Sequence, residues 1–153
     1  MAEYLLSNAH SVGEAHLHLV FTPAYRRRVF TSRVLRDVLL SLFQQEAQKD
    51  GFTLAAVDFG PDHVHLFLAQ WKRWSIAALA QRLKGATSRT LRRDYRYLFV
   101  DKLWGGKFWT GGYFYRTVGA VTADTVRRYV EESQGKHWIP APTLEQRTIV
   151  AYV

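Results

Sequence analysis

The sequence contains no cysteine among its 153 residues. That absence excludes a disulfide scaffold, a zinc site built on thiolates and a cysteine nucleophile. No run approaches the ~20 apolar residues that a helix needs to cross a bilayer. The first residues also lack the basic stretch and apolar core of a secretory signal. We therefore expect a soluble protein of the cytoplasm with no membrane partner.

Acidic residues are the scarcer charge, with 13 Asp and Glu against 21 Lys and Arg, which gives a formal net charge of +8. Net charge informs on partners rather than on fold, and a basic protein attracts polyanions. Nucleic acid is the commonest polyanion in the cytosol. Many soluble proteins are merely basic, so the charge alone does not establish a function.

Long repeats and low-complexity tracts are absent as well. The length and the 48% hydrophobic content fit one folded domain. We place this domain at residues 1–138. Residues 139–153 begin with two prolines and are interpreted as a C-terminal tail, either an edge strand or a partner-binding arm.

Patterns of apolar and turn residues predict the secondary structure. Strands are expected at 14–23, 52–60, 63–71 and about 113–118, and helices from Thr31 or Ser32 to Asp50-Gly51, from Ser75 to Tyr95, and over 124–135. This order predicts an α+β fold with a ferredoxin-like (RRM-like) antiparallel sheet, helices on one face and a C-terminal tyrosine-bearing helix. The strand order does not follow from the pattern.

Two histidines flank one valine in DHVHLF at 62–67. Residues i and i+2 of a strand point to the same face, so His63 and His65 can share one divalent metal ion. The alternative is a pair of partly buried histidines with hydrogen-bond partners, which is the commoner meaning of an isolated pair. The spacing alone therefore indicates a candidate metal site without establishing it.

A second pair of the same spacing, His16 and His18, lies in the first predicted strand. At most one pair is needed for a metal. Twin catalytic motifs, as in two-histidine phosphoesterases, are disfavoured because those motifs have Thr or Ser at the third position. We favour the pair at 63–65 because Asp62 precedes it and a tight turn would present it at a sheet edge.

Tyr129 lies in the last predicted helix, within RRYVEESQGKHW at 127–138. A tyrosine on a helix usually belongs to the core or to an interface. It can also act as a nucleophile toward phosphorus, although its pKa near ~10 makes it a poor one until a metal or cation stabilises the phenolate. Two histidine ligands elsewhere in the chain would supply that metal.

The segment DHVHLF resembles the HUH signature (His, hydrophobic, His) of the single-tyrosine transposases of the smallest insertion sequences, which are TnpA-like enzymes. Four other segments resemble motifs of this family in the same order. They are HLVFTPAYRRRVF (18–30), LKGATSR (83–89), FWTGGYFYRTVG (108–119) and VRRYVEESQ (126–134). Each motif is weak alone, but the ordered set covers about residues 15–137 and identifies the chain as a member of the family.

The resemblance implies an enzyme that cuts and rejoins single-stranded DNA bearing hairpins at the ends of its element. His63 and His65 would hold a divalent metal, Mg²⁺ or Mn²⁺, and Tyr129 would attack the scissile phosphate to leave a 5′-phosphotyrosine and a free 3′-OH. The family acts as a homodimer, in which the tyrosine helix of one subunit can complete the site of the other. Imidazole ligands suit Mn²⁺ better than Mg²⁺, which prefers oxygen.

The third metal ligand departs from the family pattern, in which a glutamine follows the tyrosine by four residues. Here that position is Ser133, and Gln134 is the fifth. At about 100° per residue, the fourth position lies ~40° from Tyr129 around the helix and the fifth ~140° away. A one-residue π-bulge would return Gln134 to the site. We expect Gln134 to serve through such a bulge, with Glu132 as the second candidate.

Basic residues are expected to bind the DNA. They are Arg26, Arg27 and Arg28 in the first turn and Lys84, Arg89, Arg92 and Arg93 on the second helix, which also carries Arg82. The alternative is a solvated helix face. Aromatic residues can stack on unpaired bases, although most here fit a core better, and Trp109 and Tyr113 in particular are interpreted as structural.

Two functions of different classes remain open. The first is the metal-dependent enzyme that nicks and joins single-stranded DNA. The second is a ferredoxin-like domain that binds single-stranded or hairpin nucleic acid without cutting it, and a domesticated relative lies between them. Relaxases share the HUH core but are usually larger. Only the histidine pair and the tyrosine helix distinguish the enzyme from the binding module.

Overall fold

The computed structural model describes residues 5–7, 12–14 and 16–118. Its elements in chain order are β1 (Leu5–Ser7), β2 (Val12–Glu14), β3 (His16–Phe21), the 3₁₀ helices η2 (Ala24–Arg26) and η3 (Val29–Thr31), α1 (Arg33–Asp50), β4 (Thr53–Phe59), β5 (Val64–Ala69), α2 (Ile76–Asp94), the 3₁₀ helix η4 (Arg96–Leu98) and β6 (Phe114–Val118). The tyrosine-bearing helix and the tail lie outside the described residues.

Both helices begin at the serines that the sequence indicates. The hydroxyl of Ser32 accepts a hydrogen bond of 3.2 Å from the N–H of Leu35 at the start of α1, and Ser75 caps α2 in the same way at 3.0 Å. Such side-chain acceptors satisfy N–H groups that have no partner in the first turn. The helix α1 ends at Gly51, whose φ of 81° is readily adopted only by glycine.

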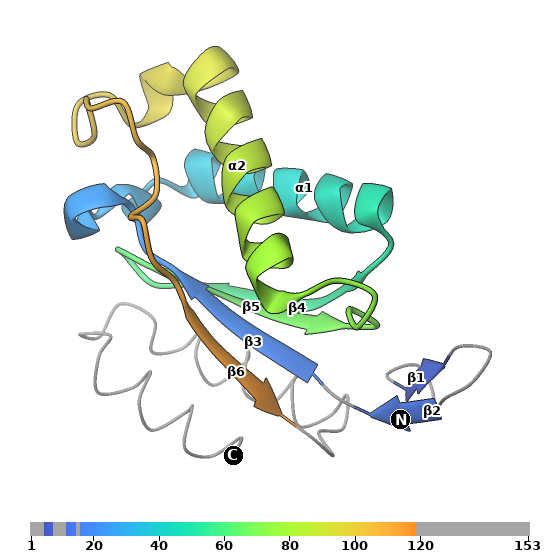
Figure 1. Ribbon diagram of the computed structural model, residues 1–153. Coiled ribbons are helices and arrows are strands. Elements are labelled where there is room, and N and C mark those ends of the chain that lie inside the picture. The colour runs from blue at the N-terminus through green and yellow to red at the C-terminus, as the bar shows by residue number, and fades with distance from the viewer. Residues whose placement is uncertain (1–4, 8–11, 15, 119–153) are drawn as a thin grey trace.

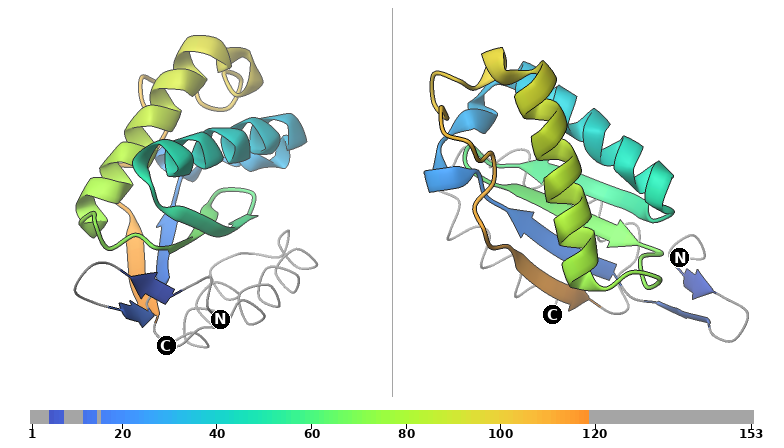
Figure 2. Two further views of the ribbon diagram at one scale, coloured as in Figure 1. Left: turned by 90° about the vertical axis from the view of Figure 1, so that its right-hand side faces the viewer. Right: turned by 45° about the horizontal axis from the view of Figure 1, so that its top comes forward.

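Four strands form one antiparallel sheet in the order β4-β5-β3-β6. The helices α1 and α2 cross each other on one face of this sheet, as Figure 1 shows and the rotated views of Figure 2 confirm. The β-α-β-β-α-β arrangement with this strand order is ferredoxin-like. The predicted fold class is therefore confirmed over the described residues, and the structure supplies the strand order.

Alternation along the strands separates the apolar core from the histidines. Leu17, Leu19 and Phe21 of β3 belong to the core that the helices cover. Successive strand residues point to opposite faces, so His16 and His18 lie on the other face. His65 lies on that face too, because it is opposite Val20 in the register. Both histidine pairs thus lie on the side of the sheet away from α1 and α2.

The segment between η4 and β6 is tied to the body of the domain by Trp109. Its indole is buried, its Nε1–H donates to the hydroxyl of Thr87 at 3.0 Å, and its backbone bridges to Pro23. The expectation that Trp109 is structural is confirmed. Tyr113 was expected to be structural as well, but 37% of its surface is exposed.

The short hairpin β1–β2, which precedes β3, was not predicted. Its strands have three residues each, too few for the alternation of a strand to be visible in the sequence. Within the described part of the chain, no helix is long and apolar enough to cross a membrane.

Candidate metal site and nucleic-acid interface

The pair His63 and His65 lies at the start of β5, which is a central strand. β5 pairs with β4 on one side and with β3 on the other, so the prediction of a sheet-edge position was wrong. The predicted turn is present, because the N–H of Gly60 donates to the carbonyl of His63 at 2.9 Å. A turn at the end of a central strand presents the pair just as well, with neighbouring strands on both sides.

His63 is held by a chain of polar contacts. Its Nδ1 lies 2.9 Å from Oδ1 of Asp62, and the other carboxylate oxygen of Asp62 lies 3.2 Å from the guanidinium of Arg26. The imidazole also lies directly against Gly60, where a Cβ would overlap the ring. In the sequence Asp62 is notable only as a neighbour of the pair, whereas in the structure it orients His63.

His65 contacts a histidine of the second pair. Its Nδ1 lies 2.9 Å from Nε2 of His18, which is 47 residues away in the sequence. His18 is stacked on Phe67 with ring centroids 4.6 Å apart and planes at 2°. The centroids of His63 and His65 are 4.9 Å apart with their planes at 89°, so the two imidazoles lie beside each other.

Burial keeps the imidazoles of His18 and His65 neutral at physiological pH. Burial, together with a smaller contribution from the nearby charge of Arg116, lowers the pKa of His18 to about 3. Burial likewise holds the pKa of His65 well below its ordinary value, with additional contributions from His18 and His63. Neutral imidazole is the form that coordinates metal ions.

The pair fits a divalent cation as two of its ligands. Asp62 contacts Nδ1 of His63, and His18 contacts Nδ1 of His65. Nε2 of each ring is therefore the nitrogen suited to coordination. Metal-binding histidines commonly hydrogen-bond through the ring nitrogen that does not bind the metal. Among the described residues, no group of three or more His, Cys, Asp or Glu side chains is arranged to hold a metal. The predicted third ligand, Gln134 or Glu132, and Tyr129 lie outside the described residues.

A cleft of about 350 Å³ opens beside His63 and contains a basic residue of the first turn. It is lined by Arg26, Thr22, Thr110 and Phe114, among others. Arg26 is about half exposed, so its guanidinium can contact Asp62 and remain accessible to an anion. Arg27 lies over the ring of Trp104 at 5.0 Å, and Arg28 is exposed. The structure thus brings Arg26 to the histidine pair.

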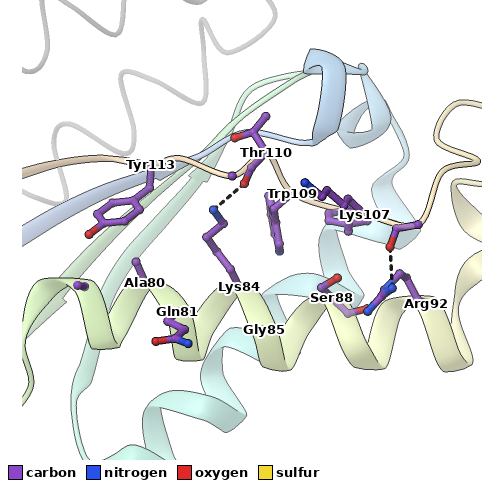
Figure 3. Close-up of a pocket in the computed structure, with 14 residues that line it drawn as sticks. Ala80, Gln81, Lys84, Gly85, Ser88, Arg92, Lys107, Trp109, Thr110 and Tyr113 are labelled. Atoms are coloured by element: carbon purple, nitrogen blue, oxygen red, sulfur yellow. Dashed lines mark hydrogen bonds between the residues drawn. The ribbon is translucent and has the colours of Figure 1, made fainter.

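A second groove, of about 500 Å³, lies between α2 and residues 106–113, which we call the strap (Figure 3). Lys84 extends from α2 and donates to the carbonyls of Thr110 at 2.6 Å and Gly112 at 2.9 Å. Arg92 donates to the carbonyl of Gly106 at 2.6 Å. Burial lowers the pKa of Lys84. These two cations therefore fasten the strap to α2, a role that the sequence did not suggest.

The remaining basic side chains of α2 divide into two groups. Arg89 and Arg93 are exposed, and Arg93 pairs with Asp94 at 2.8 Å. Arg82 instead forms an ion pair with the buried carboxylate of Asp50 at 3.2 Å and stacks on Trp74. Arg82, although partly exposed, is thus engaged in the contact between the helices, and DNA binding by Arg89 and Arg93 remains a prediction.

Sequence reasoning missed the parts played by His18, Gly60 and Thr110. The repeated spacing of HLHL and HVHL was a visible signal for His18, because a second pair in the neighbouring strand can face the first. Gly60 and Thr110 gave no signal of their own: their importance comes from which side chain approaches them in space.

The fold and the site together define a class: a ferredoxin-like domain with a paired-histidine site at the start of a central strand, beside a basic cleft. Residues 11–133 match the family of IS200-like transposases. The chain belongs to this family. It is accordingly a DNA transposase, an enzyme that cleaves and rejoins DNA.

Relatives and solved structures agree with this membership. The chain is 31% identical over 125 residues to the ISDra2 transposase TnpA of Deinococcus radiodurans, covering 82% of this chain and 88% of that protein. It is 29% identical over 131 residues to the IS200 transposase of Salmonella typhimurium, covering 84% and 85%. A crystal structure of a candidate transposase from Deinococcus radiodurans has a TM-score of 0.64 at 27% identity, covering 82% of this chain and 95% of that one.

A more distant structure shares the fold alone. It is a REP-associated tyrosine transposase bound to a REP hairpin, with a TM-score of 0.54 and 12% identity, covering 87% of this chain and 74% of that one.

Proposed function

We propose that this transposase nicks and rejoins single-stranded DNA at the ends of an insertion sequence through a 5′-phosphotyrosine intermediate on Tyr129. One observation carries the proposal: His63 and His65 lie side by side, each with Nδ1 engaged, next to a cleft lined by Arg26. Such an arrangement suits the binding of a cation and a phosphate together. The alternative, a domain that binds nucleic acid without cutting it, does not need the paired imidazoles.

The metal-binding residues in this proposal are His63 and His65, with Gln134 or Glu132 as the third ligand. A Mg²⁺ or Mn²⁺ ion held there supplies Lewis acidity at the scissile phosphate. Asp62 orients the imidazole of His63, and burial of His65 limits the protonation that would compete with metal binding. Arg26 adds positive charge where negative charge develops on the phosphate oxygens.

The covalent step forms one bond and breaks one. The oxygen of Tyr129 attacks phosphorus, a new P–O bond forms to the tyrosine, and the bond between phosphorus and the 3′ oxygen breaks. The phenol loses its proton and the leaving 3′ oxygen gains one. The 3′-OH of another strand reverses the step, so the energy of the phosphodiester is kept for rejoining without ATP.

We further propose that the substrate carries DNA hairpins and that the active form is a homodimer. The exposed side chains of Arg26, Arg27, Arg28, Arg89 and Arg93 are among the cations that phosphates can reach in the described part of the chain. A transposase of the same fold was solved with a hairpin bound, which supports the choice of substrate. Light scattering of the purified chain with and without DNA tests the dimer.

Covalent capture tests the mechanism. The purified chain is incubated with Mn²⁺ and single-stranded DNA that contains the ends of its own element, and a denaturing gel detects a protein–DNA adduct. We expect the adduct from the wild type, and none from Tyr129→Phe, from His63→Ala or without metal.

Two results would contradict the proposal. An adduct that persists in Tyr129→Phe would assign the nucleophile elsewhere. Salt-sensitive binding of the native ends with no adduct at any Mn²⁺ concentration would favour the non-cutting binding module.

A further inference from the structure

The second histidine pair is not used by the mechanism proposed above. His18 of this pair nevertheless lies in hydrogen-bond contact with His65, with 2.9 Å between Nε2 of His18 and Nδ1 of His65. Both rings are buried, with 1% and 3% of their surfaces exposed. A polar contact this short and this well shielded from water is strengthened by its low-dielectric surroundings.

We infer that His18 is a positioning residue for the metal site, fixing the orientation and the tautomer of His65 so that Nε2 of His65 faces the ion. The inference rests on the proposed role of His65 as a metal ligand. In this arrangement His63 and His65 bind the metal ion, and His18 of the second pair holds His65 in position.

The sheet holds His18 in place for this task. In the register β3 to β5, His18 lies opposite Phe67 and Val20 lies opposite His65, so His18 and His65 are diagonal neighbours on one face. The near-parallel stack of His18 on Phe67 fixes the plane of its ring. Phe114 from β6 lies edge-on to it, 6.0 Å away. The ring of His18 therefore cannot turn away from His65 without disrupting the packing.

A hydrogen bond between two neutral imidazoles can form with either ring as the donor, and His65 is the donor in the inferred arrangement. With its proton on Nδ1, His65 donates to Nε2 of His18 and keeps a lone pair on its own Nε2 for a metal ion. With its proton on Nε2, His65 would accept at Nδ1 and have no lone pair to offer. Partners of this kind orient metal-bound histidines, and losing one typically costs ~10–100-fold in metal affinity or activity.

The test replaces the acceptor while keeping the stacking. In His18→Phe the aromatic stack on Phe67 is retained and the hydrogen bond is lost, whereas in His18→Gln a side-chain oxygen can still accept from Nδ1. Nitrogen NMR of the imidazoles in metal-free protein reports the tautomer of His65, and titration with Mn²⁺ reports the affinity. Thermal unfolding checks that each variant is folded.

We expect the wild type to carry the His65 proton on Nδ1. In His18→Phe we expect mixed tautomers and Mn²⁺ affinity lower by ~10–100-fold, with recovery of most of the affinity in His18→Gln. Adding His18→Phe to His65→Ala should cause no further loss, because the effect passes through His65. A His16→Phe control should leave the tautomer of His65 unchanged.

Three results would overturn the inference. The first is a wild-type His65 with its proton on Nε2, and the second is a folded His18→Phe variant that binds Mn²⁺ as the wild type does. The third is a loss of Mn²⁺ affinity on His18→Phe that is equally large in the His65→Ala background. Failure of the proposed function has a different signature. The wild-type chain would then give no Mn²⁺-dependent adduct, although His65 still carried its proton on Nδ1 and His18→Phe still changed it.

Discussion

At Gly60 the absence of a side chain leaves room for the imidazole of His63. A Cβ there would lie 2.5 Å from Nε2 and 2.7 Å from Nδ1 of His63, far inside van der Waals contact. His63 is almost fully buried and is also bonded to Asp62, so its ring cannot easily move aside. The glycine therefore permits the position of the imidazole on which the proposed coordination depends.

Substituting Gly60→Ala should displace the ring of His63 and break its contact with Asp62. We expect Mn²⁺ affinity to fall by at least ~10-fold, in line with the loss of an orienting partner, and covalent adduct formation to fall with it. Isothermal titration with Mn²⁺ and the capture assay measure both effects.

Gly85→Ala is the matched control, since a Cβ in the middle of α2 would meet no atom within 4 Å. Alanine favours a helix interior over glycine by ~0.5–1 kcal/mol, so this variant should be more stable and bind Mn²⁺ as the wild type does. Unchanged Mn²⁺ affinity in Gly60→Ala would show that the ring has room to move.

At the scale of elements, α1 and α2 are joined by a cluster of charges. Glu46 and Asp50 of α1 are both buried, and Arg82 of α2 pairs with Asp50 while stacking on Trp74. Burial raises the pKa of Glu46, and the negative charge of Asp50 raises it further. The positive charges of Lys49 and Arg82 oppose this rise without cancelling it, so the pKa of Glu46 stays raised.

We expect Glu46→Gln to stabilise the protein at neutral and alkaline pH. Because the folded-state pKa of Glu46 lies above its unfolded value, stability from the protonated form is present at low pH and is lost as the pH rises through the folded pKa. The variant escapes that loss. Its unfolding free energy should exceed that of the wild type at pH 8, and the gap should close as the pH falls to the ordinary glutamate pKa of 4.5.

Urea unfolding at several pH values measures this gap. Asp37→Asn removes an exposed acid from the same helix, and it should change stability by no more than ~0.5 kcal/mol at any of them. A pH-independent difference between Glu46→Gln and the wild type would mean that Glu46 is not under charge strain.

The helix α2 also anchors the strap, because Lys84 and Arg92 donate hydrogen bonds to backbone carbonyls of the strap. Thr110 of the strap also lines the cleft beside His63, as does Tyr113, which borders both grooves. Fastening the strap therefore shapes one wall of the histidine site. The helix face consequently contains both structural cations and exposed ones.

At the scale of the whole molecule, the net charge of +8 predicts strong salt dependence of DNA binding. Each phosphate contact to a single strand contributes a slope of about −0.7 in log K against log salt concentration. Arg89→Met should therefore flatten the slope by ~0.7, since that side chain is exposed on α2. Lys84→Met should leave the slope unchanged, because its ammonium is bound to the strap.

Fluorescence anisotropy with a labelled oligonucleotide, at salt concentrations from about 50 to about 200 mM, measures both slopes. Circular dichroism confirms that Lys84→Met is folded. A flatter slope in Lys84→Met than in Arg89→Met would reverse the assignment and make Lys84 the phosphate contact.

Local features of the sequence determined most of the fold. The serine caps, the stop at Gly51 and the alternation of the strands each lie within a short window, and the helices and central strands formed where those windows predicted. The spacing of His63 and His65 likewise placed both on one face, since the period of a strand is two. The family resemblance, carried by five ordered motifs, predicted the membership that the comparisons confirmed.

Only the tertiary structure decided how those parts meet. It made β5 a central strand, brought His18 to His65 across 47 residues, and directed Lys84 to the strap rather than to solvent. These contacts depend on strand order, register and side-chain direction, which arise when distant segments pack together. The sequence by itself determined the candidate ligands, and the packing of β3 against β5 determined which nitrogen of His65 faces His18.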